Sequence, residues 1–270
     1  MMIRVAIAGI AGRMGQALIE ALSGRAELKL VAAFERPQGP ALGEDAGLVA
    51  GSRNRLGIPV TVVSQAALRE CDVLIDFTRP EATVAHARAC AGAGCRLVAG
   101  TTGLDAGQQR LLRDLAAEVA IVHAPNMSPG VNLCFYLVEI AARALGPEAD
   151  IEVIEAHHRH KKDAPSGTAL QFGAVAAAAR GLRLEDHALY GRHGTDAVRR
   201  AGEIGFSAIR GGDIVGDHTV LFALAGERVE ITHRASTRDN FARGALLAAG
   251  WIMERERGLY DMQDVLGLRG

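Results

Sequence analysis

The sequence has little of what membrane-spanning or nucleic-acid-binding proteins need. Aromatic residues make up 4% of the 270-residue chain, and its charges nearly cancel, leaving a formal net charge of −1. Such a balance gives no electrostatic reason to expect nucleic acid or an anionic membrane as a partner. No apolar run reaches the roughly eighteen residues of a membrane span, and no charged-then-apolar leader opens the chain. These absences predict a cytoplasmic protein that acts on a small molecule.

Cysteine is equally scarce. Cys71, Cys90, Cys95 and Cys134 form no C-x-x-C pair, and each lies on or beside a segment with strand or helix character. We therefore expect reduced thiols that pack in a core, and neither disulfides nor metal ligands. The hydrophobic share of 49%, with few aromatics, predicts a core of small aliphatic side chains, as in parallel sheets covered by helices.

A glycine turn near the start of the chain indicates a nucleotide site. An apolar strand over residues 3–7 runs into Gly9, Gly12 and Gly15, and a helical pattern follows to residue 22. Glycines at such a turn allow the backbone to approach a pyrophosphate at the helix N-terminus. The spacing is G-x-x-G-x-x-G and not G-x-G-x-x-G, so an ordinary strand-to-helix turn remains an alternative.

An acidic and a basic residue follow the second predicted strand, at residues 28–34. Glu35 lies about twenty residues after the last glycine, where a ribose-binding acid is expected. An acid there favours the free hydroxyl of NADH, whereas Arg36 can pair with the additional phosphate of NADPH. With Arg13 nearby in sequence, we expect both cofactors to bind, and the preference between them stays open.

Further strands end in loops of small polar residues. Strands are predicted at residues 60–63, 73–77, 97–99 and 120–123, with helices from Pro80 and over residues 105–118 between them. The carboxyl ends of such strands form the ligand crevice of doubly wound sheets. The turn-rich passage at residues 124–130 suits a domain hinge, and its Asn126 could face the nicotinamide amide. A capping turn, with Ser128 as cap and Pro129 in the first helical turn, is equally compatible.

The second half of the chain has a different order of predicted helices and strands. After a helix over residues 131–145, strands are predicted at residues 205–210, 219–225 and 228–232 with no helices between them. Consecutive strands of this kind argue for an antiparallel or mixed sheet, and hence for a second domain. We expect Asp239 to cap a final helix, residues 241–255, that packs back on the first domain.

Residues 155–168, EAHHRHKKDAPSGT, concentrate the reactive side chains of the sequence. They follow a predicted strand that ends near His157, and Pro165 prevents any helix from starting earlier. Ser166 and Thr168 both occupy possible cap positions before the apolar run at residues 169–179. Backbone N–H groups at such a helix start bind carboxylates or phosphates, and Gly167 allows close approach.

Lys161 and His158 could reach the same anion, so the stretch suits a small acidic substrate and proton transfer. Its three histidines could instead bind a metal ion, but Arg159, Lys161 and Lys162 lie among and beside them and would repel one. A solvated basic loop is a second alternative, which the flanking apolar strand and the capped helix make less favoured.

These residues together resemble the 4-hydroxy-tetrahydrodipicolinate (dihydrodipicolinate) reductases of bacterial and plant lysine biosynthesis. The resemblance covers nearly the whole chain. Its most specific part is the 155–168 stretch, supported by residues 9–15, 76–80, 100–103 and 124–128.

The resemblance implies an α/β fold of two domains. Residues 1–128 and 239–270 would form a Rossmann-like dinucleotide-binding domain. Residues 129–238 would form an α+β substrate-binding and oligomerisation domain with a mixed sheet, through which a homotetramer assembles.

The resemblance also assigns roles to individual residues. It gives proton transfer to His157 and Lys161, and binding of the substrate carboxylates to His158, Gly167 and Thr168. The expected cofactor contacts are Gly9, Ile10, Ala11, Gly12, Arg13, Met14, Glu35, Arg36, Gly100, Thr101, Thr102, Ala124, Pro125, Asn126 and Met127. Two departures are Lys162, where an apolar residue is common, and Pro129, which stiffens the hinge passage.

The implied reaction is NAD(P)H-dependent reduction of 4-hydroxy-tetrahydrodipicolinate to tetrahydrodipicolinate with loss of water, in the diaminopimelate route to lysine. Hydride addition to a conjugated imine leaves electron density that Lys161 or His157 can protonate. An oxidoreductase acting on another small acid would share the first domain. A nucleotide-sensing module would keep the glycine turn but has no need of the histidines and the lysine. No metal is expected.

Overall fold

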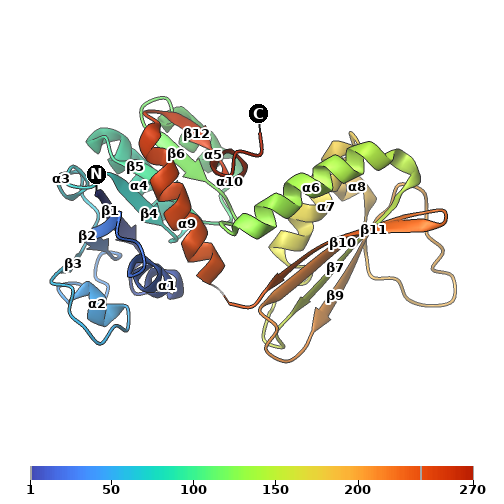
Figure 1. Ribbon diagram of the computed structural model, residues 1–270, viewed down its shortest axis with the longest axis horizontal. Coiled ribbons are helices and arrows are strands. Elements are labelled where there is room, and N and C mark those ends of the chain that lie inside the picture. Colours follow the sequence, from blue (N-terminus) through green and yellow to red (C-terminus); the bar gives the residue numbers. More distant parts are fainter. Residues whose placement is uncertain (1, 238, 270) are drawn as a thin grey trace. The chain divides into compact units, whose positions relative to one another are not determined.

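The computed structural model describes residues 2–237 and 239–269 and divides the chain into two compact units. Unit 1 contains Met1–Pro129 and Asp239–Gly270, and unit 2 contains Gly130–Arg238. Unit 2 is therefore inserted in the sequence of unit 1. Each unit has its own sheet (Figure 1). Each also has its own buried hydrophobic core.

Unit 1 is built on a parallel sheet of seven strands in the order β12-β6-β5-β4-β1-β2-β3. The strands are β1 (Ile3–Ala8), β2 (Leu28–Phe34), β3 (Val60–Thr61), β4 (Val73–Asp76), β5 (Arg96–Ala99), β6 (Ala120–His123) and β12 (Gly258–Tyr260). Every neighbouring pair in this sheet is parallel. The predicted Rossmann-like α/β fold is confirmed.

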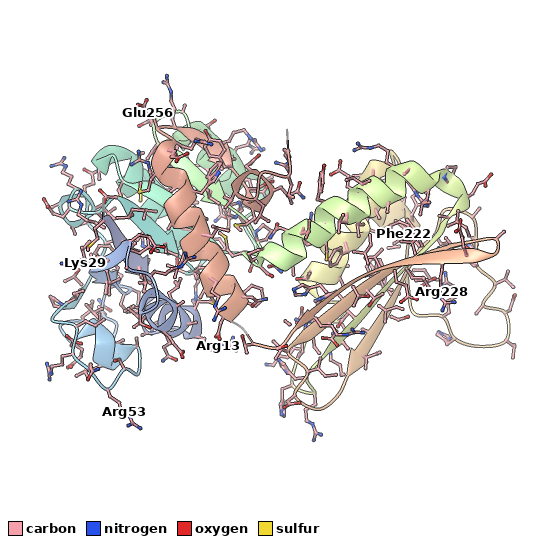
Figure 2. The ribbon with its side chains drawn as sticks, viewed as in Figure 1. Arg13, Lys29, Arg53, Phe222, Arg228 and Glu256 are labelled. Carbon is pink, nitrogen blue, oxygen red and sulfur yellow. The ribbon has the colours of Figure 1, made fainter. Side chains whose placement is uncertain are left out.

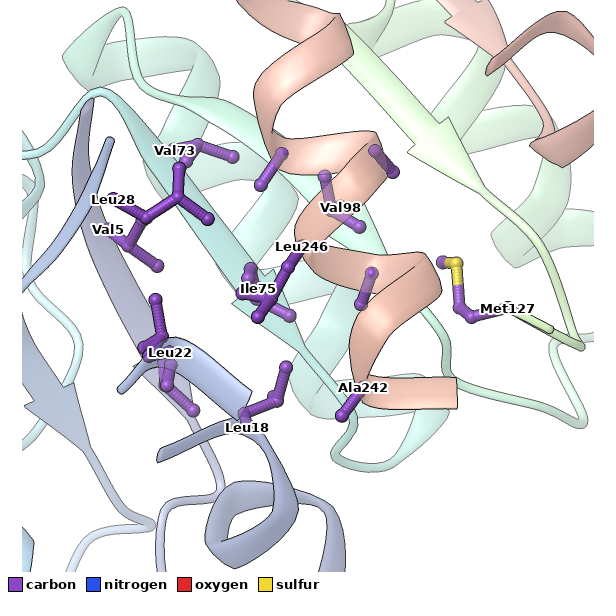
Figure 3. Close-up of a cluster of buried hydrophobic side chains, with 14 of the residues drawn as sticks. Val5, Leu18, Leu22, Leu28, Val73, Ile75, Val98, Met127, Ala242 and Leu246 are labelled. Carbon is purple, nitrogen blue, oxygen red and sulfur yellow. The ribbon is translucent and has the colours of Figure 1, made fainter. Parts of the chain in front are cut away.

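Helices cover both faces of this sheet. They are α1 (Arg13–Leu22), α2 (Ala46–Val49), α3 (Gln65–Leu68), α4 (Pro80–Ala93), α5 (Ala106–Leu115), α9 (Asp239–Trp251) and α10 (Met262–Val265). Successive strand residues point to opposite faces, so Val5 packs with α1 and α9, whereas Ala6 packs with α4 and α5. In Figure 3, Leu18 from α1 and Leu246 from α9 lie over the strand side chains of the buried cluster that contains Val5.

Unit 2 has a mixed sheet of five strands in the order β11-β10-β7-β9-β8. The strands are β7 (Asp150–His157), β8 (Ala188–Tyr190), β9 (Ile204–Arg210), β10 (Gly216–Leu224) and β11 (Glu227–Ala235). β10 is antiparallel to β7 and to β11, whereas β7, β9 and β8 are parallel. The predicted mixed sheet is confirmed.

The helices of unit 2 pack on one face of this sheet. They are α6 (Pro129–Leu145), α7 (Gly167–Ala179) and α8 (Leu184–His187), with a short 3₁₀ turn at Gly146–Glu148. Phe135 of α6 and Phe172 of α7 meet with ring centroids 4.5 Å apart. Phe222, on β10, belongs to the same buried cluster (Figure 2).

Several predicted boundaries are wrong in detail. The final helix predicted over residues 241–255 spans Asp239–Trp251, so Asp239 is its first residue and not its cap. A 3₁₀ turn, β12 and α10 follow it, so it is not the last element. Residues 258–260 instead extend the sheet of unit 1 by pairing with β6. The strand from Val60 ends at Thr61, and the helix over residues 105–118 spans only Ala106–Leu115.

All four cysteines are free and buried, as predicted. Across residues 2–237 and 239–269, no helix has both the length and the apolar character that a bilayer crossing requires.

Candidate active site

The end of β7 places two polar side chains inside unit 2. Along this strand Ile151, Val153, Glu155 and His157 alternate into the interior, and the last two continue the inward face with a carboxylate and an imidazole. Glu155 is 1% exposed and His157 is 8% exposed. A buried charge is stable only where partners surround it.

Glu155 has such partners on every side. Arg210 donates from Nη1 to Oε2 at 2.8 Å and from Nη2 to Oε1 at 2.7 Å, a bidentate pair. The Ser166 N–H donates to Oε1 at 3.1 Å, and His157 Nδ1 lies 2.6 Å from Oε2. Burial raises the pKa of Glu155, but the hydrogen bonds from Arg210 and His157 outweigh it and hold that pKa below its ordinary value. Glu155 is thus ionised at neutral pH.

This carboxylate determines which nitrogen of His157 carries the proton. Burial lowers the pKa of His157 despite the opposing effect of Glu155, so the ring is neutral near pH 7. An ionised carboxylate can only accept, so Nδ1 must be the donor and the lone pair lies on Nε2. Nε2 faces Gly216, where an added Cβ would lie 3.0 Å from it.

A second buried histidine lies against the first. His218 of β10 meets His157 edge-on, with ring centroids 5.1 Å apart, and its Nε2 lies 2.9 Å from Ser166 Oγ. Ser166 Oγ also accepts the Ala169 N–H at 3.1 Å, which makes Ser166 the N-cap of α7. Burial lowers the pKa of His218 to about 4.

Lys161 lies in the loop between β7 and α7. Its Nζ is 2.9 Å from Asp163 Oδ1, and its side chain is 20% exposed. This contact lowers the pKa of Asp163. The ammonium also lies close enough to His157 to lower the pKa of the imidazole. The two predicted proton-transfer residues thus lie on either side of the junction between β7 and the loop that follows it.

The predicted carboxylate-binding residues lie around the same loop. Of the two predicted caps, Ser166 is the cap, and Gly167 and Thr168 form the first turn of α7. An added Cβ at Gly167 would meet no atom within 4 Å, so the backbone there is open to close approach. His158 lines a surface hollow of about 640 Å³ together with Arg159, His160, Gly212 and Asp213.

In unit 1 the glycine turn is held against the ends of β1 and β2. Gly9 has φ +77°, which favours glycine, and an added Cβ at Gly15 would lie 2.4 Å from the Ile10 carbonyl oxygen. The Ala11 N–H donates to Glu35 Oε2 at 3.4 Å. Glu35 thus lies beside the turn, and Arg13 begins α1 (Figure 2).

A buried polar network fixes the neighbouring strand ends. Asp76 is fully buried and accepts from the Thr78 N–H at 2.8 Å and from Thr78 Oγ1 at 2.6 Å, and His86 Nδ1 lies 2.9 Å from it. Thr101 Oγ1 lies 2.7 Å from Thr83 Oγ1. The Thr101 side chain is therefore turned inward, and a ligand can meet only its backbone, whereas Thr102 is exposed.

Three other predicted cofactor residues are equally restricted. The side chains of Ile10, Ala124 and Met127 are buried in the core of unit 1, so they can offer a cofactor only backbone groups. Pro125 is exposed, and Asn126 is partly buried and accepts the Ser128 N–H at 2.9 Å. A hollow of about 1300 Å³ lies elsewhere, along α1 and β2, and of the predicted residues only Arg13 lines it.

The part of the chain that the structure describes contains no group of three or more His, Cys, Asp or Glu side chains arranged to hold a metal ion. Glu155, near the end of β7, instead pairs with Arg210, and Asp163 in the following loop pairs with Lys161.

Comparison with known proteins decides the family. The sequence profile of "Dihydrodipicolinate reductase, N-terminus" matches residues 3–127, and that of "Dihydrodipicolinate reductase, C-terminus" matches residues 130–266. The chain belongs to the dihydrodipicolinate reductase family. It is 55% identical over 270 residues to the 4-hydroxy-tetrahydrodipicolinate reductase of Methylococcus capsulatus, covering 100% of both chains. It is 54% identical over 267 residues to that of Nitrosomonas europaea, covering 99% of both.

Solved structures of this family and of other proteins share the fold. A dipicolinate-bound dihydrodipicolinate reductase from Paenisporosarcina sp. TG-14 matches with a TM-score of 0.78 and 25% identity, covering 98% of this chain and 99% of that one. An amine dehydrogenase from Mycobacterium smegmatis matches with a TM-score of 0.67 and 13% identity, covering 95% and 94%, which shows the fold alone.

Two residues of this candidate site were missed by the sequence analysis. Arg210 and His218 lie 55 and 52 residues from their partners Glu155 and Ser166, so no local pattern joins them. One signal was present for His218, which alternates inward with Val220 and Phe222 along β10. A polar residue at an inward position of a strand points to a buried network.

Proposed function

We propose that this chain reduces 4-hydroxy-tetrahydrodipicolinate to tetrahydrodipicolinate with loss of water, in the diaminopimelate route to lysine. Membership of the reductase family over both units is the observation that carries the proposal. His157 at the end of β7 and Lys161 in the loop before α7 support it, because a sensor or a plain dinucleotide-binding module has no need of them.

We assign cofactor binding to unit 1. The residues at the glycine turn fit a dinucleotide: Gly9 takes the left-handed backbone, Gly15 leaves no room for a side chain, and Glu35 stands beside the turn. Gly12 to Met14 would hold the pyrophosphate at the start of α1, and Glu35 and Arg36 the ribose or its phosphate. NADPH or NADH, when bound, supplies the hydride. Backbone groups at Gly100 to Thr102 and Ala124 to Met127 complete the proposed contacts.

We assign substrate binding and proton transfer to unit 2. The first turn of α7, at Gly167 and Thr168, would bind one substrate carboxylate, and His158 would assist. The dipicolinate bound to the Paenisporosarcina reductase supports a small dicarboxylate as ligand. Neutral His157 offers a lone pair at Nε2 and so accepts a proton, whereas the Lys161 ammonium donates one.

These two groups suit both halves of the reaction. Loss of water requires a base for the ring proton and an acid for the departing hydroxyl, which Nε2 of His157 and Nζ of Lys161 provide. After the hydride has been added, the ring must regain a proton, and the imidazolium formed in the first step can return it. Positioned acids and bases of this kind contribute about a hundredfold or more to the rate.

We also propose that the enzyme is a cytoplasmic homotetramer joined through the sheet of unit 2. Support comes from the face of that sheet opposite α6 and α7, where Ile209 is 51% exposed. Light scattering of the purified chain measures its mass directly. A monomer at micromolar concentration would contradict the assembly and leave the proposed reaction untouched.

The decisive assay follows the absorbance of NADPH, and in parallel of NADH, when the protein meets the condensation product of pyruvate and aspartate semialdehyde. We expect rapid consumption that depends on the condensation product and is inhibited competitively by dipicolinate. Folded protein that binds NADPH but consumes none would refute the substrate assignment and favour a related oxidoreductase or a nucleotide sensor.

A further inference from the structure

Arg210 binds two parts of the candidate active site, Glu155 and the backbone of Asp163, without being one of the proton-transfer residues. It ends β9, next to the end of β7, and its side chain is 20% exposed. Both terminal nitrogens bind Glu155, and Nη2 also donates to the Asp163 carbonyl oxygen at 2.6 Å. One guanidinium therefore reaches both the strand and the loop.

Each of these contacts leads to a different functional group. Through Glu155, Arg210 is connected to Nδ1 of His157 and to the N–H of Ser166, the cap of α7. Arg210 also binds the backbone of Asp163, and the carboxylate of Asp163 pairs with Lys161. The positions of His157, Lys161 and the first turn of α7 therefore all depend on contacts that Arg210 makes.

We propose that Glu155 and Arg210 are positioning residues that hold His157 in its Nδ1–H tautomer and tie its orientation to the Lys161 loop and the start of α7. The proposal rests on the proposed function for its catalytic consequence, but the tautomer and the titration of His157 can be tested without turnover. Glu155 acts on the imidazole as an acceptor and as a charge, and Arg210 keeps Glu155 ionised and oriented.

The charges around His157 predict the effect of removing Glu155. Glu155 on β7 raises the pKa of His157, whereas Lys161 in the loop and Arg210 on β9 lower it, and burial lowers it most. His218 on β10 also faces it and stays neutral, because its own pKa is about 4. In Glu155→Gln the favourable charge is lost and both cations remain, so the pKa of His157 must fall further.

The first experiment is ¹⁵N NMR of histidine-labelled full-length chain, with the His157 signal assigned by its absence in His157→Gln. In the unmodified chain we expect the Nδ1–H tautomer at neutral pH. In Glu155→Gln, an isosteric change, we expect a lower pKa for His157. An Nε2–H tautomer in the unmodified chain, or an unchanged titration in Glu155→Gln, would overturn the proposal.

The second experiment measures kinetics in the same variant. We expect kcat to fall about a hundredfold, the usual scale for a misplaced acid–base group, with a smaller change in KM and unchanged NADPH affinity. Retention of the original kcat would overturn the positioning role. If the unmodified chain itself consumes no NADPH while the titration moves as expected, the proposed function fails and the placement of His157 stands.

Arg210→Ala provides an independent variant. We expect a similar loss of kcat, with partial recovery in low millimolar guanidinium and none in methylammonium, because only the planar fork can bridge Glu155 and the Asp163 carbonyl. Absence of any loss would overturn the role of Arg210. Arg192→Gln is the matched control, because it removes an arginine that pairs with Glu152 of the same strand. It should leave kcat within about twofold of the unmodified chain.

Discussion

His218 makes the stability of unit 2 depend on pH in a way that one substitution can isolate. The imidazole is 5% exposed, and its pKa falls from an ordinary 6.5 to about 4, mainly because burial disfavours the charged form. The unfolded chain therefore binds a proton between these values that the folded chain does not. Acidification favours unfolding, and stability is lost as the pH falls from 6.5 towards 4.

The size of this loss follows from the two pKa values. The full difference of about 2.5 pH units corresponds to about 3 kcal/mol. Between about pH 7.5 and about pH 5 the unfolded histidine becomes almost fully protonated and the folded one stays neutral, which costs about 2 kcal/mol. In His218→Gln this loss should disappear, because glutamine does not titrate and can still hydrogen-bond Ser166 Oγ.

The measurement must report on unit 2 alone. The single tryptophan, Trp251, lies in α9 of unit 1, so its fluorescence follows the other unit. Hydrogen exchange of the β10 amides at increasing urea gives the opening free energy of unit 2 at each pH. Contributions of His157 and His233, whose pKa values burial also lowers, are common to both proteins and cancel. An acid-induced loss of equal size in both proteins would refute the reasoning.

Three further predictions concern catalysis and cofactor binding. Lys161→Ala should lower turnover about a hundredfold or more while NADPH affinity, measured by fluorescence titration, stays nearly intact; a large loss of affinity would contradict assigning the cofactor to unit 1. Gly15→Ala places a Cβ 2.4 Å from a backbone oxygen, so we expect the free energy of unfolding of unit 1 to fall by about 1–3 kcal/mol and NADPH binding to weaken. Its control is Gly92→Ala, where the added Cβ meets only the end of the flexible Gln65 side chain. We therefore expect urea unfolding to show an unchanged or higher stability. Arg36→Ala should weaken the binding of NADPH and not that of NADH, and equal weakening of both would argue against a contact with the additional phosphate.

Local sequence patterns were sufficient for the elements that carry the glycine turn and the β7–α7 loop. In each case a strand, a turn and a helix are contiguous, and glycine, proline or a capping serine marks the junction. The alternation of aliphatic residues in β1 and β7 likewise predicted which positions face the cores.

What the sequence could not supply is pairing between distant segments. Glu155 stood out in the sequence, but its ion pair with Arg210 depends on the parallel register of β7 and β9, which places Arg210 opposite His157. Short elements were missed for a related reason. β12 spans three residues and exists only through pairing with β6, so no local periodicity marks it. The buried side chain of Thr101 depends in the same way on Thr83, which lies on α4.

The insertion of unit 2 within unit 1 has a consequence for the order of folding during synthesis. Unit 2 is continuous in sequence, so its strands and helices emerge from the ribosome in one uninterrupted stretch and can fold before α9 is made. Unit 1 must wait, because Leu246 and its neighbours on α9 fill the core over β1 and β4, and β12 forms one edge of the sheet. Until α9 has been made, that core is open to water, although the first segment of unit 1, residues 1–129, has already been synthesised. A nascent chain stalled before Asp239 should therefore carry a folded second unit and an incomplete first one.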